Sequence, residues 1–586
     1  LDFYFTSIEG IQVETEDRFL ETGSKIKLGD ESLTVIIQGD VEADGVIDAL
    51  DYFKVRRYIL GTIELSDLER AAIAQEDGTV SDSVYFAIKR HVLQTLDLFD
   101  TPQRTPAGVD HNGVKVAYIP LDDRPVNVDR MQYLAAAAGF DLHMPARDWY
   151  STRLDHMPPN ENGTRIGDRE KLLEWLKQEE ASCDYFVISL DQMMSGGLVG
   201  SRALTNTDLS LEMEIADYLI ALSKRKTVVV FDTVMRLAST VGFEGYTRAE
   251  YDKLRSYGKI ARKTLTGSAL TIDNIVAGYR GDSNGNPIST SLSDTVVTDY
   301  LQSRERKLRI ADKLLQGGEF AYFYIGVDDS SPETTIQTNE INYITAKLGG
   351  NGRLFAGADE LGLMGLAKIA TLLYGSPGVC VNYFGQGSNW PADDFDTGTL
   401  RDNVNNHLAS LGLAIVDRDP RVLQFYVLTR DSSVPSISDQ ADRLIARLKE
   451  DLENGVAAVV IDASGGRVLQ PKMMAVGLDL SMLLGYSNWN TAGNMIGIAM
   501  AQGVTRYLYL TRSTEVTEDS NAAFLQSMTF AYIKDISYKL FYPGGSGSLT
   551  DRMLSDPGPC GAPAIIKRIN SGHIITSLRK YKAEPS

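Results

Sequence analysis

The sequence is poor in cysteine and histidine. Its 586 residues include 3 cysteines and 6 histidines, and no HExxH or GxSxG motif occurs. Cys183, Cys380 and Cys560 lie far apart without CxxC spacing, so they indicate neither a zinc site nor a disulfide framework. Zinc hydrolysis and a serine triad therefore have little support, and His143 and His407 are interpreted as structural.

The sequence also lacks an excess of positive charge, and it has no long apolar runs. The formal net charge is −20, from 58 basic and 78 acidic residues, so the chain would repel a polyanion and nucleic acid is disfavoured as a partner. The longest apolar runs, such as 457–461, fall far short of the roughly 18 to 20 residues that span a bilayer. No membrane span is expected. The hydrophobic fraction of 43% is typical of a globular chain with several domains.

Acidic residues near the amino terminus have the spacing of a calcium loop. Oxygen donors at alternate positions converge on Ca²⁺ when the chain turns sharply at the sixth position, where Gly45 stands. An acidic surface turn is the simpler alternative. The predicted ligands of one structural Ca²⁺ are Asp40, Glu42, Asp44, the Val46 carbonyl, Asp48 and Asp51.

The calcium loop belongs to a segment that recurs 33 residues later, with Tyr52 matching Tyr85. In the second copy Ile73 and Ser81 stand where the first has Asp40 and Asp48. Several carboxylates are thus lost, and the second loop is expected to be empty.

This duplicated loop and helix resembles the dockerin modules of clostridial extracellular enzymes, over residues 38–100. The resemblance implies a cohesin or other scaffold protein as partner and an extracellular or cell-surface location. It also raises the expectation of carbohydrate chemistry. Residues 1–37 are predicted to be a lead-in segment with a β-hairpin.

After a linker at 101–112, the pattern predicts a large α/β domain over 113–586, with mostly parallel sheets and a break between two subdomains near 300–350. Short apolar runs alternate with amphipathic helices there, as expected for buried strands. The predicted strands are 114–121, 185–190, 227–231, 320–327, 379–384, 422–428, 457–461 and 507–510.

Acidic residues follow several of these strands, at the edge where ligands gather in parallel sheets. Each aspartate could instead cap the following helix. Doublets exceed what capping requires, and neighbouring carboxylates raise one another's proton affinity, which gives an acid and a base at neutral pH. The candidate catalytic residues are Asp122, Asp123, Asp191, Asp328, Asp329, Asp359 and Glu360.

Three arginines and an amide-rich segment are candidates for substrate binding. The arginines can hold an anionic group or fix the carboxylates, while an indole ring flanked by amides suits a sugar face and its hydroxyls. A structural turn is the alternative for the amide-rich segment. The candidates are Arg124, Arg202, Arg236, Asn488, Trp489, Asn490 and Asn494.

Five long motifs occur in order at 118–127, 189–202, 328–330, 357–360 and 488–494. Together they resemble the uncharacterised family named domain of unknown function 4127, over about residues 113–512. The resemblance implies no reaction.

The sequence leaves three functions open. The first is a secreted carbohydrate-active enzyme, a glycoside hydrolase with Asp122 or Asp123 and Asp328 or Asp329 as its paired carboxylates. The second is a hydrolase that uses a divalent metal, because an all-oxygen cluster suits hard cations. The third is a non-catalytic component of an extracellular assembly. Self-association is compatible with all three.

Overall fold

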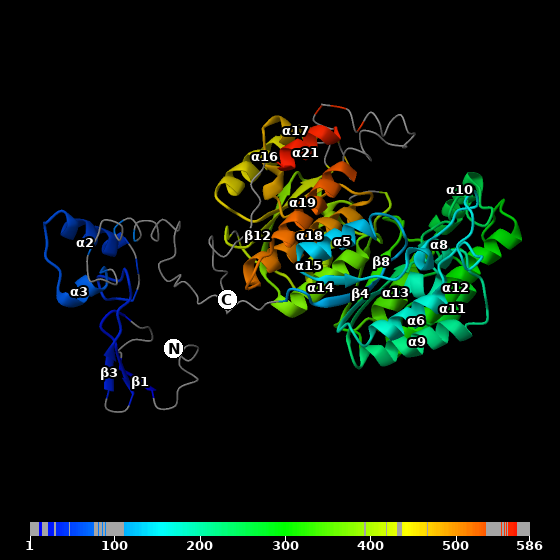
Figure 1. Ribbon diagram of the computed structural model, residues 1–586, viewed down its shortest axis with the longest axis horizontal. Coiled ribbons are helices and arrows are strands. Elements are labelled where there is room, and N and C mark those ends of the chain that lie inside the picture. The colour runs from blue at the N-terminus through cyan, green and yellow to red at the C-terminus, as the bar shows by residue number, and fades with distance from the viewer. Residues whose placement is uncertain are drawn as a thin grey trace. The chain divides into compact units, whose positions relative to one another are not determined.

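The computed structural model describes residues 11–14, 21–28, 31–45, 47, 49–74, 80, 85, 88, 111–391, 394–417, 419–430, 436–465, 467–534, 553, 556, 558 and 561–570. The chain divides into two compact units, Leu1–Pro106 and Ala107–Glu584 (Figure 1), which are described separately below. In the part of the chain that the structure describes, no helix is long and apolar enough to cross a membrane.

Over its described residues, the first unit has a small antiparallel sheet and the short helices α2 and α3. Strands β1 (Ile11–Glu14), β2 (Lys25–Leu28) and β3 (Glu31–Thr34) pair in that order, and helices α2 (Ala49–Ile59) and α3 (Asp67–Ala71) follow. The rings of Tyr52 and Tyr85 stack with centroids 5.0 Å apart, and their hydroxyls lie 2.6 Å apart. Equivalent positions of the two sequence repeats thus pack against each other.

The second unit begins with a six-stranded sheet in which all neighbouring strands are parallel, in the order β5-β4-β6-β7-β8-β9. Counted along the chain this is order 2-1-3-4-5-6, a doubly wound arrangement whose switch point lies between β4 and β6. The strands are β4 (Lys115–Ile119), β5 (Asp141–His143), β6 (Tyr185–Ser189), β7 (Thr227–Val234), β8 (Tyr322–Val327) and β9 (Gly352–Ala356).

A second parallel sheet follows with the order β11-β10-β12-β13-β14, which is order 2-1-3-4-5 along the chain. It repeats the winding of the first sheet. Its strands are β10 (Gly378–Phe384), β11 (Ala414–Ile415), β12 (Leu423–Thr429), β13 (Ala458–Ala463) and β14 (Gly485–Ser487).

Helices cover both sheets. Those after the first-sheet strands are α5 (Asp129–Ala137), α6 (Arg169–Glu179), α7 (Leu190–Ser195), α8 (Leu198–Ser201), α9 (Ser210–Ser223), α10 (Arg248–Lys259), α11 (Ile272–Gly278), α12 (Asp294–Gly317), α13 (Gln337–Lys347) and α14 (Leu361–Tyr374). Those that follow β10 are α15 (Leu400–Leu411), α16 (Ile437–Glu453), α17 (Leu469–Ala475), α18 (Ala492–Arg512), α19 (Glu518–Phe530) and α21 (Ala562–Asn570).

Alternate residues of the first-sheet strands face two different cores. Ile188 and Val230 face a core made with α6, α9 and α12, whose ribbons lie together in Figure 1. Val187 and Val229 face the opposite way, into a core that includes α5, α14, α18 and the strands of the second sheet. The two sheets therefore share one continuous core.

Two features differ from the sequence-based expectations. Residues 507–510, predicted to be a strand, lie inside the buried helix α18, because an apolar run of four residues has no periodicity that distinguishes a strand from a buried helix. The first sheet also continues through β9, so the change of sheet falls around α14 rather than at 300–350.

Candidate functional site

A cavity of about 530 Å³ lies at the carboxyl ends of the first-sheet strands, at the switch point between β4 and β6. Doubly wound sheets bind ligands in this position, and the volume suits a small ligand. The first sheet contributes Asp122, Asp123, Arg124, Pro125, Leu198, Val199, Arg202, Arg236, Thr240, Asp328, Asp329, Gly357, Ala358 and Asp359, together with Thr152, Leu154 and Met157 from the loop after β5. The segment after β14 contributes Asn490, Thr491 and Asn494.

None of the predicted aspartates at the strand ends is a helix N-cap. The helices that follow β4, β6, β8 and β9 are α5, α7, α13 and α14, and their N-cap residues are Val128, Ser189, Ile336 and Glu360. Glu360, the one acidic residue among these, makes no side-chain cap hydrogen bond, so capping does not account for the acidic residues at these positions.

Asp122 is buried and held by hydrogen bonds. Its Oδ1 accepts from the Arg124 backbone N–H at 3.1 Å and from Asn127 Nδ2 at 2.8 Å, and its Oδ2 accepts from Arg124 Nε at 2.8 Å. Burial raises the pKa of Asp122, but the Arg124 charge and these hydrogen bonds outweigh burial and lower the pKa below its ordinary value. Asp122 is therefore a fixed carboxylate that positions Arg124.

Asp123, the next residue, is half-buried, and its carboxylate makes fewer hydrogen bonds than that of Asp122. Its Oδ1 accepts from the Thr152 backbone N–H at 3.4 Å. Asp123 thus presents a carboxylate to the cavity without an arginine partner among the ion pairs of the described residues.

Two aspartates after β8 face two arginines. Asp328 forms a buried ion pair with Arg202, and Asp329 Oδ2 lies 3.4 Å from Arg236 Nη1. Burial and the neighbouring Asp328 raise the pKa of Asp329, and burial beside Arg202 lowers the pKa of Arg236 to about 10. Asp329 also has a positive φ of 29°, a strained backbone conformation of the kind that gathers at functional sites.

Asp359 is hydrogen-bonded to residues that follow strands of both sheets. Its carboxylate accepts from Arg124 Nη1 at 3.3 Å and from Trp489 Nε1 at 3.3 Å, while Asn494 Oδ1 accepts from the Asp359 backbone N–H at 3.0 Å. Asn490 lines the same wall with a φ of 63°. Residues after β14 of the second sheet thus complete a site that begins on the first.

Four predicted site residues lie outside the cavity lining. Asp191 is buried and forms an ion pair with Lys307, and the buried Glu360 has its Oε1 3.7 Å from His407 Nε2. Asn488 donates to the Asp462 carbonyl at 2.9 Å, and Trp489 packs against the hydrophobic core while it donates to Asp359. The sequence places each of these beside a strand end, but it does not determine which way the side chain points.

The structure also adds residues that the sequence analysis missed. Thr152, Thr240, Leu154 and Met157 line the cavity from loops that carry no recognisable motif. Asn127 was within a quoted motif but was not assigned a role, although it holds Asp122.

In the first unit, the described calcium-loop residues form a compact turn. Asp40 is fully buried, and its carboxylate accepts from the backbone N–H groups of Thr22 at 2.8 Å and Asp44 at 3.1 Å. Asp51 Oδ1 accepts from the Glu42 backbone N–H at 2.9 Å. Val46 and Asp48 lie outside the described residues.

Fold and site together define a class: a doubly wound α/β protein with an aspartate- and arginine-lined cavity between two parallel sheets. A family model described as a protein of unknown function, DUF4127, matches residues 116–541, and the chain belongs to this family. Searches of curated proteins and of solved structures found no significant match.

Proposed function

We propose that the cavity binds a carbohydrate and hydrolyses a glycosidic bond with a pair of aspartates. The observation that carries the proposal is that aspartates of contrasting environment line one cavity. Burial and Asp328 favour the protonated form of Asp329, whereas Asp123 retains free oxygen atoms and has only a weak backbone hydrogen bond. Such a difference between carboxyl groups that line one cavity is the pattern of acid and base pairs in glycosidases.

In this proposal Asp329 donates a proton to the leaving oxygen, and Asp123 acts as base or nucleophile. Asp122 and Asp328 take positioning roles, because both are bound to arginines. The half-exposed Arg124 and the amides of Asn490 and Asn494 would bind sugar hydroxyls at the wall shared by the two sheets.

The metal-dependent alternative has less geometric support. Among the described residues, the one group of three potential ligand atoms within 4.8 Å of one another is His143, Glu179 and Cys183, which do not line the cavity. The charges of Asp122, Asp328 and Asp359 are instead balanced by arginines.

The first unit is the basis for a second proposal, which concerns where the protein is located. We infer that the loop at 40–51 binds one Ca²⁺ and that residues 38–100 dock onto a cohesin or similar scaffold outside the cell. Support comes from the ligand spacing and from the buried Asp40 carboxylate at the centre of the loop turn.

The test uses Asp329→Asn and Asp123→Asn, with Asp252→Asn on the exposed face of α10 as a matched control. An amide keeps the size of the side chain but cannot transfer a proton, so turnover on a panel of polysaccharides should fall by about 10² to 10⁴. Reducing-end release measures turnover, and thermal melting checks the fold.

If the two variants lose activity only in proportion to a lower melting temperature, the aspartates are structural. Loss of wild-type activity with a chelator would support the metal-dependent hydrolase instead. Absence of turnover on every glycan would support a non-catalytic role in an assembly.

A further inference from the structure

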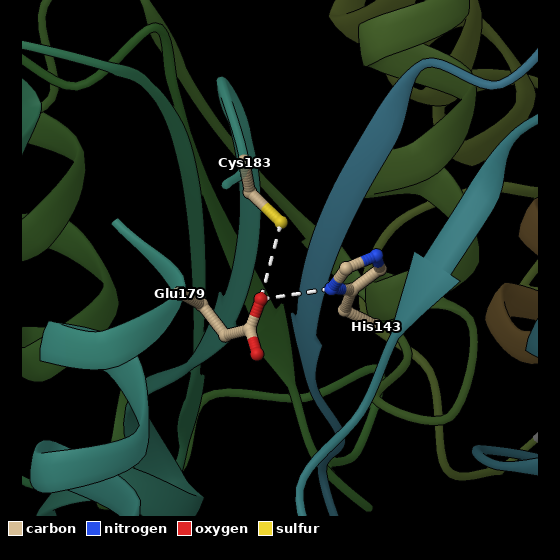
Figure 2. A group of neighbouring side chains, drawn as sticks. All are labelled: His143, Glu179 and Cys183. Carbon is tan, nitrogen blue, oxygen red and sulfur yellow. Dashed lines mark hydrogen bonds and ion pairs between the residues drawn. The ribbon is translucent and has the colours of Figure 1, made fainter. Parts of the chain in front are cut away.

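A second cluster of chemically reactive side chains lies at the edge of the first sheet, away from the cavity. Figure 2 shows His143 of edge strand β5, Glu179 at the end of α6, and Cys183 just before β6, with their side chains converging on one point. His143 Nδ1 lies 2.8 Å from Glu179 Oε2, and Cys183 Sγ lies 3.6 Å from the same oxygen. The cluster is near the amino ends of β4 and β6, whereas the cavity is at the carboxyl ends.

We propose that His143, Glu179 and Cys183 form a binding site for one Zn²⁺ ion. The three donors are a nitrogen, an oxygen and a sulfur, which is a set typical of zinc and unsuited to Ca²⁺ or Mg²⁺. A water molecule would occupy the fourth tetrahedral position. This site is independent of the proposed glycosidase activity.

The spacing of the donors fits the ion. Tetrahedral zinc with Zn–S of about 2.3 Å and Zn–N and Zn–O of about 2.0 to 2.2 Å places its ligand atoms roughly 3.4 to 3.6 Å apart. Cys183 and Glu179 already have this separation, at 3.6 Å. The distance of 2.8 Å between His143 Nδ1 and Glu179 Oε2 would widen to about 3.4 Å as the ion takes the place of the hydrogen-bonded proton, which leaves to solvent.

The backbone and the surrounding side chains orient the donors. The N–H of Cys183 donates to the Glu179 carbonyl at 2.9 Å in the turn that ends α6, which holds the thiol over the carboxylate. Ser182 Oγ donates to Glu179 Oε2 at 2.7 Å. His143 Nε2 lies 3.3 Å from Asp141 Oδ2, the carboxylate–histidine arrangement that fixes the tautomer of metal-bound histidines.

The charge balance also favours a cation. Among the described residues, neither Glu179 nor Asp141 forms an ion pair with lysine or arginine. Binding of Zn²⁺ would displace the thiol proton to solvent and form the Zn–S bond.

The exposure of the donors provides a route for the ion. Cys183 is fully buried, while the side chains of His143 and Glu179 are 24% and 21% exposed. An ion can reach the thiol past the imidazole and the carboxylate. Once bound, it would tie the three-residue edge strand β5 to α6 and β6.

The test uses the full chain with excess Ca²⁺ present, so that the calcium loop does not take up the added metal. Addition of Co²⁺ in place of Zn²⁺ should produce a near-ultraviolet thiolate-to-metal charge-transfer band at one equivalent. Zn²⁺ should bind with the same stoichiometry by calorimetry and raise the melting temperature. The matched control is Cys380→Ser, which removes another buried cysteine that, among the described residues, belongs to no group of three potential ligand atoms.

Cys183→Ser should abolish the Co²⁺ band, and Cys380→Ser should retain it. His143→Asn, on the partly exposed edge strand, provides a second variant if Cys183→Ser does not fold, and it should also abolish one-equivalent Zn²⁺ binding. Asp141→Asn should keep the band and weaken affinity by roughly 10- to 100-fold. A wild-type protein without the band, or a Cys183→Ser variant that binds Zn²⁺ as tightly as wild type, would overturn the proposal.

Discussion

At the scale of single residues, the main surprise is Glu360. The sequence places it in an Asp-Glu pair beside the cavity, but the side chain is fully buried and faces His407 instead. Burial, with Asp359 and Asp328 nearby, raises the pKa of Glu360 well above 4.5, and burial lowers the pKa of His407 to about 4. His407 is therefore neutral at pH 7, and the raised pKa of Glu360 favours its protonated form, which has a carboxyl hydrogen available to the imidazole Nε2.

Glu360→Gln should make the protein more stable than wild type at high pH. A carboxyl with a raised folded-state pKa binds a proton that the unfolded chain releases above about pH 4.5, so its contribution to stability is present below that pH and is lost as the pH rises, by up to about 1.4 kcal/mol per pH unit. The amide has no such dependence. The difference in melting temperature between variant and wild type should grow from pH 4.5 to pH 8.

A difference that is independent of pH would contradict this prediction. It would mean that Glu360 is ionised in the folded protein, as an ion pair with a protonated His407.

At the scale of elements, α18 is the helix on which the site depends. Its first turn supplies Asn494 to the cavity, and 20 of its 21 residues are buried. Gly493 and Gly503 allow close approach, because a Cβ would lie 1.9 Å from the Ala356 carbonyl oxygen and 2.1 Å from Val459 Cγ2. The first contact is with β9 of the first sheet and the second with β13 of the second sheet.

Gly493→Ala should destabilise the protein by about 1 to 3 kcal/mol, as expected for an overpacked core. The added methyl group meets a backbone carbonyl that cannot rotate away, so α18 must move and weaken the hydrogen bonds of Asn494 to Ala358 and Asp359. Denaturant unfolding measures the loss.

Gly278→Ala at the end of α11 is the matched control, since no atom lies within 4 Å of its added Cβ. Its stability should be unchanged or higher by up to about 1 kcal/mol. Equal effects of both substitutions would show that the close approach at Gly493 is not important.

The elements also show which features the sequence can predict. Seven of the eight predicted strands are present, because apolar β-branched runs bounded by polar turns identify buried strands well. The segment 507–510 is the exception, because α18 is buried on all sides and these four apolar residues have the pattern of a short buried strand. The sequence does not predict the His143, Glu179 and Cys183 group, because only Glu179 and Cys183 are close in sequence and His143 comes from a strand 36 residues earlier.

At the scale of the whole molecule, the second unit contains two parallel sheets with the same type of strand order. Its cavity is lined by residues that follow strands of both sheets. Acidic strand ends are visible in the sequence, but their meeting depends on strand order, and strand order is not encoded by any local pattern. Asp123 and Asp329 share a cavity because β4 and β8 end at the same edge of one sheet. Asp191 follows β6 at that edge too, but α7 directs its side chain into the core toward Lys307.

The first unit leads to a prediction about the chain as a whole. We expect residues 38–100 to bind one Ca²⁺, because only the first of the two repeats keeps its oxygen ligands. Calorimetry on the full chain, with EGTA-treated protein as the starting state, should give a stoichiometry of one. Asp40→Ala should abolish binding, since Asp40 accepts hydrogen bonds from three backbone N–H groups that shape the loop.

Asp40→Ala also tests whether the two units unfold independently. The two units divide at residue 106 and have separate hydrophobic cores, so Asp40→Ala should leave the main melting transition of the large unit unchanged. A zinc-selective chelator should instead lower the melting temperature of the large unit, since the proposed zinc site lies inside it. A stoichiometry of two calcium ions, or a large unit that melts earlier in Asp40→Ala, would contradict this view of the chain, because the first result requires a second calcium site and the second requires that the calcium loop stabilises the large unit.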